Sequence, residues 1–132
     1  MTLNEIHQRF FSYRNGIVAK AFHDAGTPYK RIFGLQIPQI GAIARETGYD
    51  TALARQLLEE KECREARLLA YYLINPETLT EPEAAELAGD VQTREEVDIL
   101  AWRLLRRLPY AERLLAELEG YVGEALKRNL EK

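Results

Sequence analysis

Apolar residues recur along the chain at intervals of three and four, the spacing that places them on one face of an α-helix. One such stripe comprises Val97, Leu100, Ala101, Leu104 and Leu108. No segment alternates apolar and polar residues long enough to predict a β-strand. The pattern predicts helices at 2–14, 16–25, 38–47, 50–60, 63–74, 81–89, 93–108 and 110–128. We therefore predict an all-α fold.

Several helix starts carry their own signals. In the Thr-x-x-Glu spacing, two side chains satisfy unpaired backbone N–H groups of the first helical turn. This spacing occurs at Thr2 and Glu5, at Thr80 and Glu83, and at Thr93 and Glu96. Asp50 is a further N-cap candidate. These signals support the helical interpretation independently of the apolar pattern.

The stretch FGLQIPQIGAIARE, Phe33 to Glu46, combines a short extended lead-in with a helix start. The residue before a proline is pushed out of the helical region, and proline itself fits the first helical turn. A helix should therefore begin near Pro38, and Gly48 is a suitable C-terminal stop.

Length and composition narrow the class of protein. The 132 residues are 46% hydrophobic and 30% charged, which predicts one folded domain over residues 1–132. No apolar run approaches the roughly 18 residues of a membrane-spanning helix, and Glu5 and His7 lie where a signal peptide would be apolar. We therefore expect a cytoplasmic protein with no membrane partner. The net charge of −3 does not favour nucleic acid, although a local basic face could still bind it.

Single reactive residues offer little chemistry. Cys63 is the one cysteine, and His7 and His23 lie far from it in the sequence. We therefore expect no metal site and no cofactor. Nearby arginines could activate an exposed thiol, but we expect Cys63 to be buried and unreactive.

A weak internal repeat arranges the predicted helices into an architecture. EARLLAYYLI, Glu65 to Ile74, and EVDILAWRLL, Glu96 to Leu105, share a glutamate, apolar pairs, an alanine and an aromatic residue at an offset of 31 residues. Helix pairs that repeat at about 30–45 residues are typical of an α-solenoid. Chance similarity between two amphipathic helices would explain the same letters.

The repeat makes Arg67 equivalent to Asp98 and Tyr71 equivalent to Trp102, so we expect both pairs to lie close in space. Asp98 lies at the edge of its apolar stripe, four residues after Arg94. An ion pair of Asp98 with Arg94 or Arg67 is therefore expected in preference to a catalytic role. The residues predicted to be buried between helices are Leu68, Leu69, Leu73, Val97, Leu100, Leu104, Leu114 and Leu118.

Three segments, GLQIPQIGAIARE, REARLLAYYLI and REEVDILAWRLL, together resemble the AlkD-type DNA alkylation repair glycosylases, which are built from HEAT-like helical repeats. The resemblance covers roughly residues 25–108. Its most specific parts are the Gly-x-x-x-Pro lead-in and the helix with Glu65, Arg67 and Ala70. It implies an α-α superhelix, or solenoid, of HEAT-like helix pairs. For an active chain, it implies a DNA glycosylase that acts on cationic alkylated purines.

The same resemblance identifies a candidate catalytic residue and two departures. The family's next helix begins with Trp-Asp-x-Val-Asp, and its second aspartate assists excision of the cationic purine. Here Arg94, Glu95, Val97 and Asp98 occupy those places, so Asp98 is the catalytic candidate and Arg94 replaces an aromatic wall. The chain also stops at Lys132, about where the repeat with a phosphate-binding arginine would begin. We therefore expect the fold to be kept and glycosylase activity to be impaired or lost.

Basic and aromatic residues leave two functions open. Inner helices that line a concave face would hold double-stranded DNA through the binding candidates Arg67, Arg94, Trp102, Arg103 and Arg106. Acidic residues crowd the middle of the chain, and a solvated, salt-bridged surface explains the same charges. The chain is then either a relative of these glycosylases that binds DNA, damaged DNA included, or a non-catalytic scaffold for a protein partner. The oligomeric state is not determined by these patterns.

Overall fold

The computed structural model describes residues 1–131, and the regular secondary structure in this range is helical. Its α-helices are α1 (Leu3–Ser12), α2 (Gly16–Asp24), α3 (Ile37–Thr47), α4 (Thr51–Leu58), α5 (Arg64–Leu73), α6 (Glu81–Gly89), α7 (Arg94–Arg103), α8 (Ala111–Leu115) and α9 (Gly120–Leu130), with a 3-10 helix, η1 (Leu105–Arg107), after α7. Within these residues, the only β interaction is an isolated parallel bridge between Arg31 and Cys63. The all-α prediction is confirmed. None of the described helices is both long and apolar enough to span a membrane.

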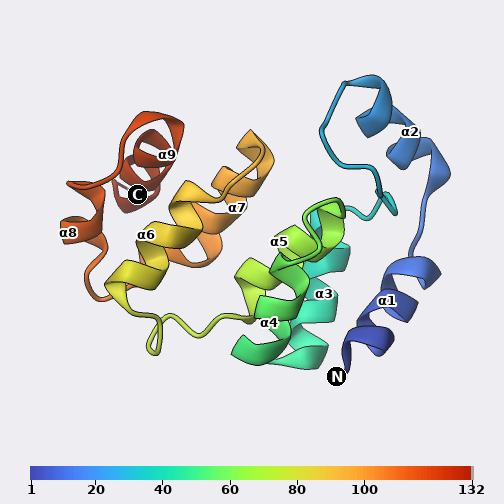
Figure 1. The fold of residues 1–132 in the computed structure, drawn as a ribbon, viewed down its shortest axis with the longest axis horizontal. Helices are drawn as coiled ribbons and strands as arrows, with labels where there is room; N and C mark the ends of the chain where they lie inside the picture. Colours follow the sequence, from blue (N-terminus) through green and yellow to red (C-terminus); the bar gives the residue numbers. More distant parts are fainter. Residues whose placement is uncertain (132) are drawn as a thin grey trace. The chain divides into compact units, whose positions relative to one another are not determined.

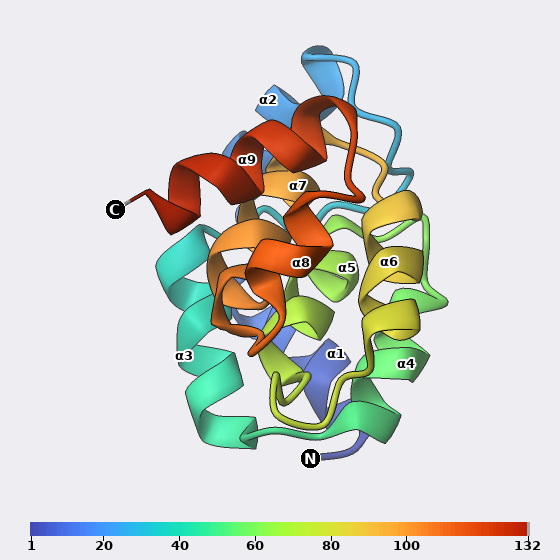
Figure 2. The same ribbon diagram turned by 90° about the vertical axis from the view of Figure 1, so that its left-hand side faces the viewer.

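The chain forms two compact units, and the single domain expected from the sequence stays a prediction. The first, Met1–Leu73, contains α1 to α5, and the second begins at Ile74 and contains α6 to α9 (Figure 1). In the first unit, α5 packs against both α3 and α4 and lies between them (Figure 2). Every residue of α5 is buried. This helix is therefore the centre of the first unit.

The predicted N-terminal caps are present. Thr2 and Glu5 satisfy each other's backbone N–H groups, and so do Thr80 and Glu83. The third predicted pair behaves differently, because the buried Glu96 carboxylate accepts a hydrogen bond from the backbone N–H of Gln92 at 3.3 Å. The Thr93 and Asp50 side chains still cap α7 and α4 by accepting from the backbone N–H groups of Glu96 and Leu53, respectively.

Two helix predictions near the C-terminus need correction. The helix predicted at 93–108 ends at Arg103, where Leu104 leaves the helical conformation with φ −126° and ψ −62°. The helix predicted at 110–128 divides into α8 and α9, because Gly120 has a φ of +65° that a continuous helix cannot contain. Leu118 lies in the connection between α8 and α9 and is half-buried. The other seven predicted core residues, six leucines and one valine, are buried.

The lead-in to α3 is held by a buried carboxylate. The Glu65 side chain is fully buried and accepts hydrogen bonds from the backbone N–H groups of Phe33, Gly34 and Leu35 at 2.9 to 3.3 Å. Arg64 donates to the same carboxylate and to the Leu35 carbonyl oxygen, both at 2.7 Å. The Gly-x-x-x-Pro lead-in and the Glu-x-Arg helix are thus parts of one structural contact.

Glycine is required at position 34 for steric reasons. Gly34 has a φ of +89°, and an added Cβ would lie 2.1 Å from the carbonyl oxygen of Asn15. The Asn15 N–H in turn donates to the Phe33 carbonyl oxygen at 2.8 Å. The lead-in therefore joins the start of α2 to α5, and α3 begins at Ile37 with Pro38 in its first turn, as the sequence predicts.

Candidate nucleic-acid interface

In the second unit, α7 has one buried face and one exposed face. Val97 and Ala101 pack against Ala125 of α9 in the buried core. Arg94, Asp98 and Trp102 follow each other at four-residue spacing and are exposed. Three of the predicted site residues therefore form a single stripe on α7.

Arg94 and Asp98, the first two residues of this stripe, contact Tyr121 of α9. The Tyr121 hydroxyl donates a hydrogen bond to Asp98 Oδ1 at 2.9 Å. The Arg94 guanidinium lies over the Tyr121 ring, 4.6 Å from its centroid, and that of Arg128 lies 5.4 Å from it. We call Arg94, Asp98, Tyr121 and Arg128 the Tyr121 cluster. It places two cations on one aromatic ring, next to one carboxylate.

Arg128 also connects the aromatic and acidic members of this cluster. Its Nη2 lies 3.3 Å from the Tyr121 hydroxyl and 3.7 Å from Asp98 Oδ1. The hydrogen bond with Tyr121, followed by the nearby charges, which include Asp98 and Glu124, raises the pKa of Arg128 above its already high ordinary value. Arg128 is therefore positively charged at neutral pH.

Trp102, the third residue of the stripe, also has two arginines near its ring. This indole is 42% exposed, and the guanidinium groups of Arg103 and Arg106 lie 5.2 and 6.0 Å from its ring. Arg106 Nε also donates a hydrogen bond to the Trp102 carbonyl oxygen. We call Trp102, Arg103 and Arg106 the Trp102 cluster. The sequence-predicted residues Trp102, Arg103 and Arg106 are thus brought together.

The sequence predicts an ion pair of Asp98 with Arg94 or Arg67, and this choice of partner is wrong. Arg128 of α9 takes the place expected for Arg94 or Arg67, while Arg94 covers Tyr121 instead. The Asp98 side chain is 52% exposed, so it lies in water and not in an apolar pocket. Tyr71 and Trp102 lie in different units, as do Arg67 and Asp98, and their expected proximity stays a prediction.

Arg67, also predicted to bind DNA, belongs to α5 of the first unit. It is fully buried, and its guanidinium donates to the carbonyl oxygen of Leu58 at 3.0 Å and to the Tyr71 hydroxyl at 3.4 Å. A side chain without accessible surface cannot reach a phosphate in this conformation. The sequence did not reveal this burial, because α5 and α7 have similar sequences, yet every residue of α5 is buried whereas α7 has an exposed face.

Sequence reasoning missed Tyr121 and Arg128 as members of the site. They lie 23 and 30 residues after Asp98. One signal was present: the two are seven residues apart, which places them two turns apart on the same face of α9. That face could have been matched with the exposed side of α7.

Other candidate residues serve the fold. Cys63 is buried, and loss of hydration raises the pKa of its thiol to about 11, so it is protonated and unreactive at neutral pH. The His7 ring contacts the Glu60 carboxylate of the first unit at 2.8 Å, and His23 is exposed. Residues 1–131 contain no group of three potential ligands that could hold a metal ion.

Comparison with known proteins places the chain in a family. The model of the family described as DNA alkylation repair enzyme matches residues 6–123, most of the chain. The chain belongs to the DNA alkylation repair enzyme family. By sequence, no curated protein matches it.

A solved structure supports the fold of this family member. It is described as a new family of proteins related to the HEAT-like repeat DNA glycosylases, with affinity for branched DNA structures. The two chains superpose with a TM-score of 0.85 at 15% identity, over 98% of this chain and 57% of the other. The chain thus spans just over half the length of that protein. The predicted HEAT-like helical-repeat fold is confirmed.

Proposed function

We propose that this member of the DNA alkylation repair enzyme family binds double-stranded DNA through the exposed stripe of α7, and that it does not release alkylated purines. The observation that carries the proposal is the Tyr121 cluster, in which Arg94 covers the aromatic ring beside Asp98. The affinity of the structural relative for branched DNA supports DNA as the class of partner.

The charges of the stripe suit phosphates better than a cationic base. The two clusters contain four arginines, whereas Asp98 is their one acidic member. Arginine forks bind phosphate oxygens in a bidentate manner, and exposed aromatic rings can contact sugars and bases. A duplex backbone laid along α7 would meet these groups in succession. Release of counterions from DNA would supply most of the binding free energy.

The same arrangement opposes excision of a cationic purine. Such a lesion needs an open π-face and a carboxylate that can act on the departing base. Arg94 already lies over the Tyr121 ring, and Asp98 Oδ1 already accepts from the Tyr121 hydroxyl. A second cation about 4 Å from Arg94 would be repelled by about 1 kcal/mol in water and about 4 kcal/mol near a protein surface.

Binding is tested by titrating a fluorescent duplex at several salt concentrations. Each phosphate contact contributes about −0.9 to the slope of log K against log salt. Arg94→Gln should lower the magnitude of this slope by about one. Arg113→Gln is the matched control, because Arg113 lies in the same unit, is 66% exposed and pairs with Glu81 at 3.0 Å, outside the stripe. Equal slopes for both variants would contradict the proposal.

The protein contains a built-in reporter of the interface. Trp102 is the single tryptophan, so its emission reports on the Trp102 cluster alone. Quenching of this emission by the duplex, with the same midpoint as the titration, would support contact at α7. A scaffold for a protein partner would show no comparable, salt-dependent affinity for DNA.

Catalysis is tested separately by a base-release assay on methylated DNA, with the parent protein and Asp98→Asn side by side. We expect no release of 3-methyl- or 7-methylpurines above background from either protein. Release by the parent that is lost in the variant would restore the enzyme and reject this part of the proposal.

A further inference from the structure

The first unit has an exposed apolar corner between α1 and α2. Phe11 is 57% exposed, Tyr13 40% and Ile17 85%. No residue of α2 is buried, and the views in Figures 1 and 2 place this helix at the outer edge of its unit, away from α3, α4 and α5. Elsewhere in the first unit, Tyr49 is the one large apolar residue with an exposed side chain.

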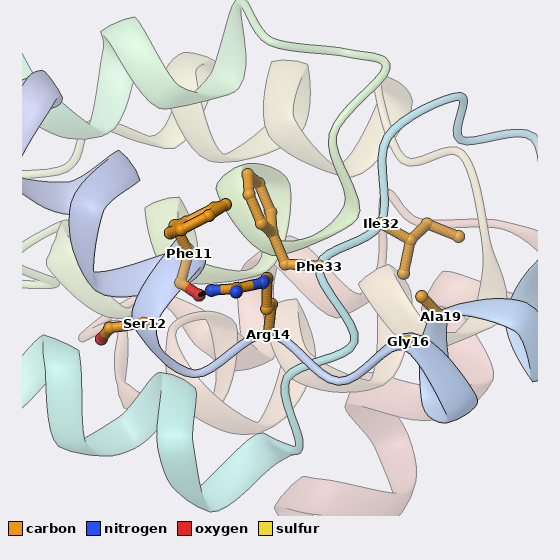
Figure 3. A pocket seen from close by; sticks show the side chains of 7 residues that line it. All are labelled: Phe11, Ser12, Arg14, Gly16, Ala19, Ile32 and Phe33. Carbon is orange, nitrogen blue, oxygen red and sulfur yellow. Dashed lines mark hydrogen bonds between the residues drawn. The ribbon is translucent and has the colours of Figure 1, made fainter.

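A depression of about 600 Å³ lies in this corner, which is within the usual range of about 300–1,000 Å³ for ligand sites. The aromatic and aliphatic side chains of Phe11, Ile32 and Phe33 line it, together with Gly16 and Ala19 at the start of α2. In Figure 3, the rings of Phe11 and Phe33 lie on one side and Ile32 and Ala19 on the other. Apolar side chains therefore face the depression from both sides, and Ser12 and Arg14 add polar surface to its lining.

A single cation completes the lining. The Arg14 guanidinium lies 3.8 Å from the centroid of the Phe11 ring and donates to the Phe11 carbonyl oxygen at 2.8 Å (Figure 3). Among residues 1–131, Arg14 has no carboxylate within ion-pair distance, whereas Arg9 and Lys20 nearby are paired with Glu46 and Asp24. No acidic side chain lines the depression. Its charge therefore suits an anionic ligand.

We infer that this depression receives an unpaired nucleobase of DNA. A nucleobase has apolar faces for the walls, and its own backbone phosphate supplies the charge that Arg14 lacks. Aromatic rings and guanidinium planes both stack on bases, so a base can continue the stack that Phe11 and Arg14 begin. The inference deepens the proposed function, because it rests on DNA as the partner and adds a preference for unpaired bases.

The test compares three DNA probes by fluorescence anisotropy: a blunt duplex, the same duplex with a tail of unpaired adenines, and the same duplex with a tail of abasic residues. The two tails carry equal phosphate charge and differ only in their bases. The parent protein should bind the adenine tail at least about fivefold more tightly than the abasic tail. Equal affinity for the two tails would overturn the inference.

Variants then locate the effect. Phe11→Ala should remove the preference, and Gly16→Leu should reduce it by filling open space, since an added Cβ at Gly16 has no atom within 4 Å. Tyr49→Ala is the matched control, because Tyr49 is an aromatic residue 56% exposed in the same unit but outside the lining. Circular dichroism confirms that each variant is folded. A preference that survives in Phe11→Ala would overturn the inference.

Failure of the inference and failure of the proposed function give different results. Arg94→Gln should weaken binding to all three probes by a similar factor and leave the ratio between tails unchanged. If no duplex is bound, a single strand of adenines measured against an abasic strand still tests the depression by itself. Concentration-dependent dimerisation that Phe11→Ala abolishes would assign the corner to a second copy of the chain and reject the nucleobase.

Discussion

Helices α5 and α7 have similar sequences and opposite surroundings. Each has a fully buried glutamate in its first turn, Glu65 in α5 and Glu96 in α7. Two positions later in the same pattern, Arg67 is buried and Asp98 is exposed. Neighbouring helices enclose α5 on both sides, while α7 leaves one stripe in water. Equivalent positions in a repeat therefore share a structural role only where their neighbours are also equivalent.

The largest expected effect concerns the glutamate of α5. Glu65→Gln leaves the buried Arg64 without its carboxylate and weakens the contacts to the lead-in. Breaking a buried pair in this way costs about 3–5 kcal/mol of unfolding free energy. Urea denaturation followed by circular dichroism measures the loss. A cost below about 1 kcal/mol would show that the lead-in does not depend on this carboxylate.

The second largest difference is expected between the equivalent aromatic residues of α5 and α7, whose removal should have different effects on stability. Tyr71 is 1% exposed and Trp102 is 42% exposed. Tyr71→Ala leaves a cavity and should cost about 3 kcal/mol, whereas Trp102→Ala should change stability by about 0.5 kcal/mol. The thermal midpoints of the two variants provide the measurement. For DNA affinity the order should reverse, with Trp102→Ala the more harmful change. Similar stability losses in both variants would remove the distinction between the helices.

Arg67 of α5 and Arg94 of α7 test the same difference between a buried helix and a partly exposed one. Arg67→Gln removes the donor to the Leu58 carbonyl oxygen inside the first unit and should cost about 2 kcal/mol. Arg94→Gln changes an exposed side chain and should alter stability by about 0.5 kcal/mol. Denaturation and DNA titration on both proteins give a double comparison. DNA binding by folded Arg67→Gln should equal that of the parent, and a weaker salt slope in that variant would return Arg67 to the interface.

Local sequence signals predicted most of the helices. Capping residues such as Thr2 and Asp50 act on groups within a few residues of themselves, so their role is visible in the sequence. The division of the helix predicted at 110–128 was not visible in the sequence. It depends on a positive φ at Gly120, which glycine permits but does not require. Gly123 is a second reason for this division. A Cβ at this position would lie 2.9 Å from the Leu118 carbonyl oxygen in the connection between α8 and α9.

The site was predicted in part for a similar reason. Four-residue spacing alone placed Arg94, Asp98 and Trp102 on one side of a helix. The direction in which that side faces depends on α9, whose contacts with α7 come from much later in the chain. The partner of Asp98 was therefore beyond local reasoning, and so was the burial of Arg67. The acidic residue shared by both repeats, Glu65 and Glu96, was a usable signal of buried backbone contacts.

The smallest effect is expected at Asp98, and it separates a surface carboxylate from a structural one. Asp98 and Arg128 are 3.7 Å apart, with side chains 52% and 59% exposed, and such pairs contribute about 0–1 kcal/mol. Asp98→Asn should therefore leave the thermal midpoint almost unchanged. The variant also removes the one negative charge of the two clusters, so its affinity for a duplex should rise about fivefold at low salt and less at high salt.

Asp24→Asn provides the control for this last prediction, because Asp24 is an exposed carboxylate paired with Lys20 at 2.7 Å in the other unit. It alters the net charge of the molecule by the same amount, so any general charge effect appears in both variants. A gain in affinity confined to Asp98→Asn places the DNA backbone near α7. Weaker binding in Asp98→Asn would instead mean that the carboxylate orients Tyr121 and Arg128 for DNA, and that their hydrogen bonds outweigh its repulsion of phosphate.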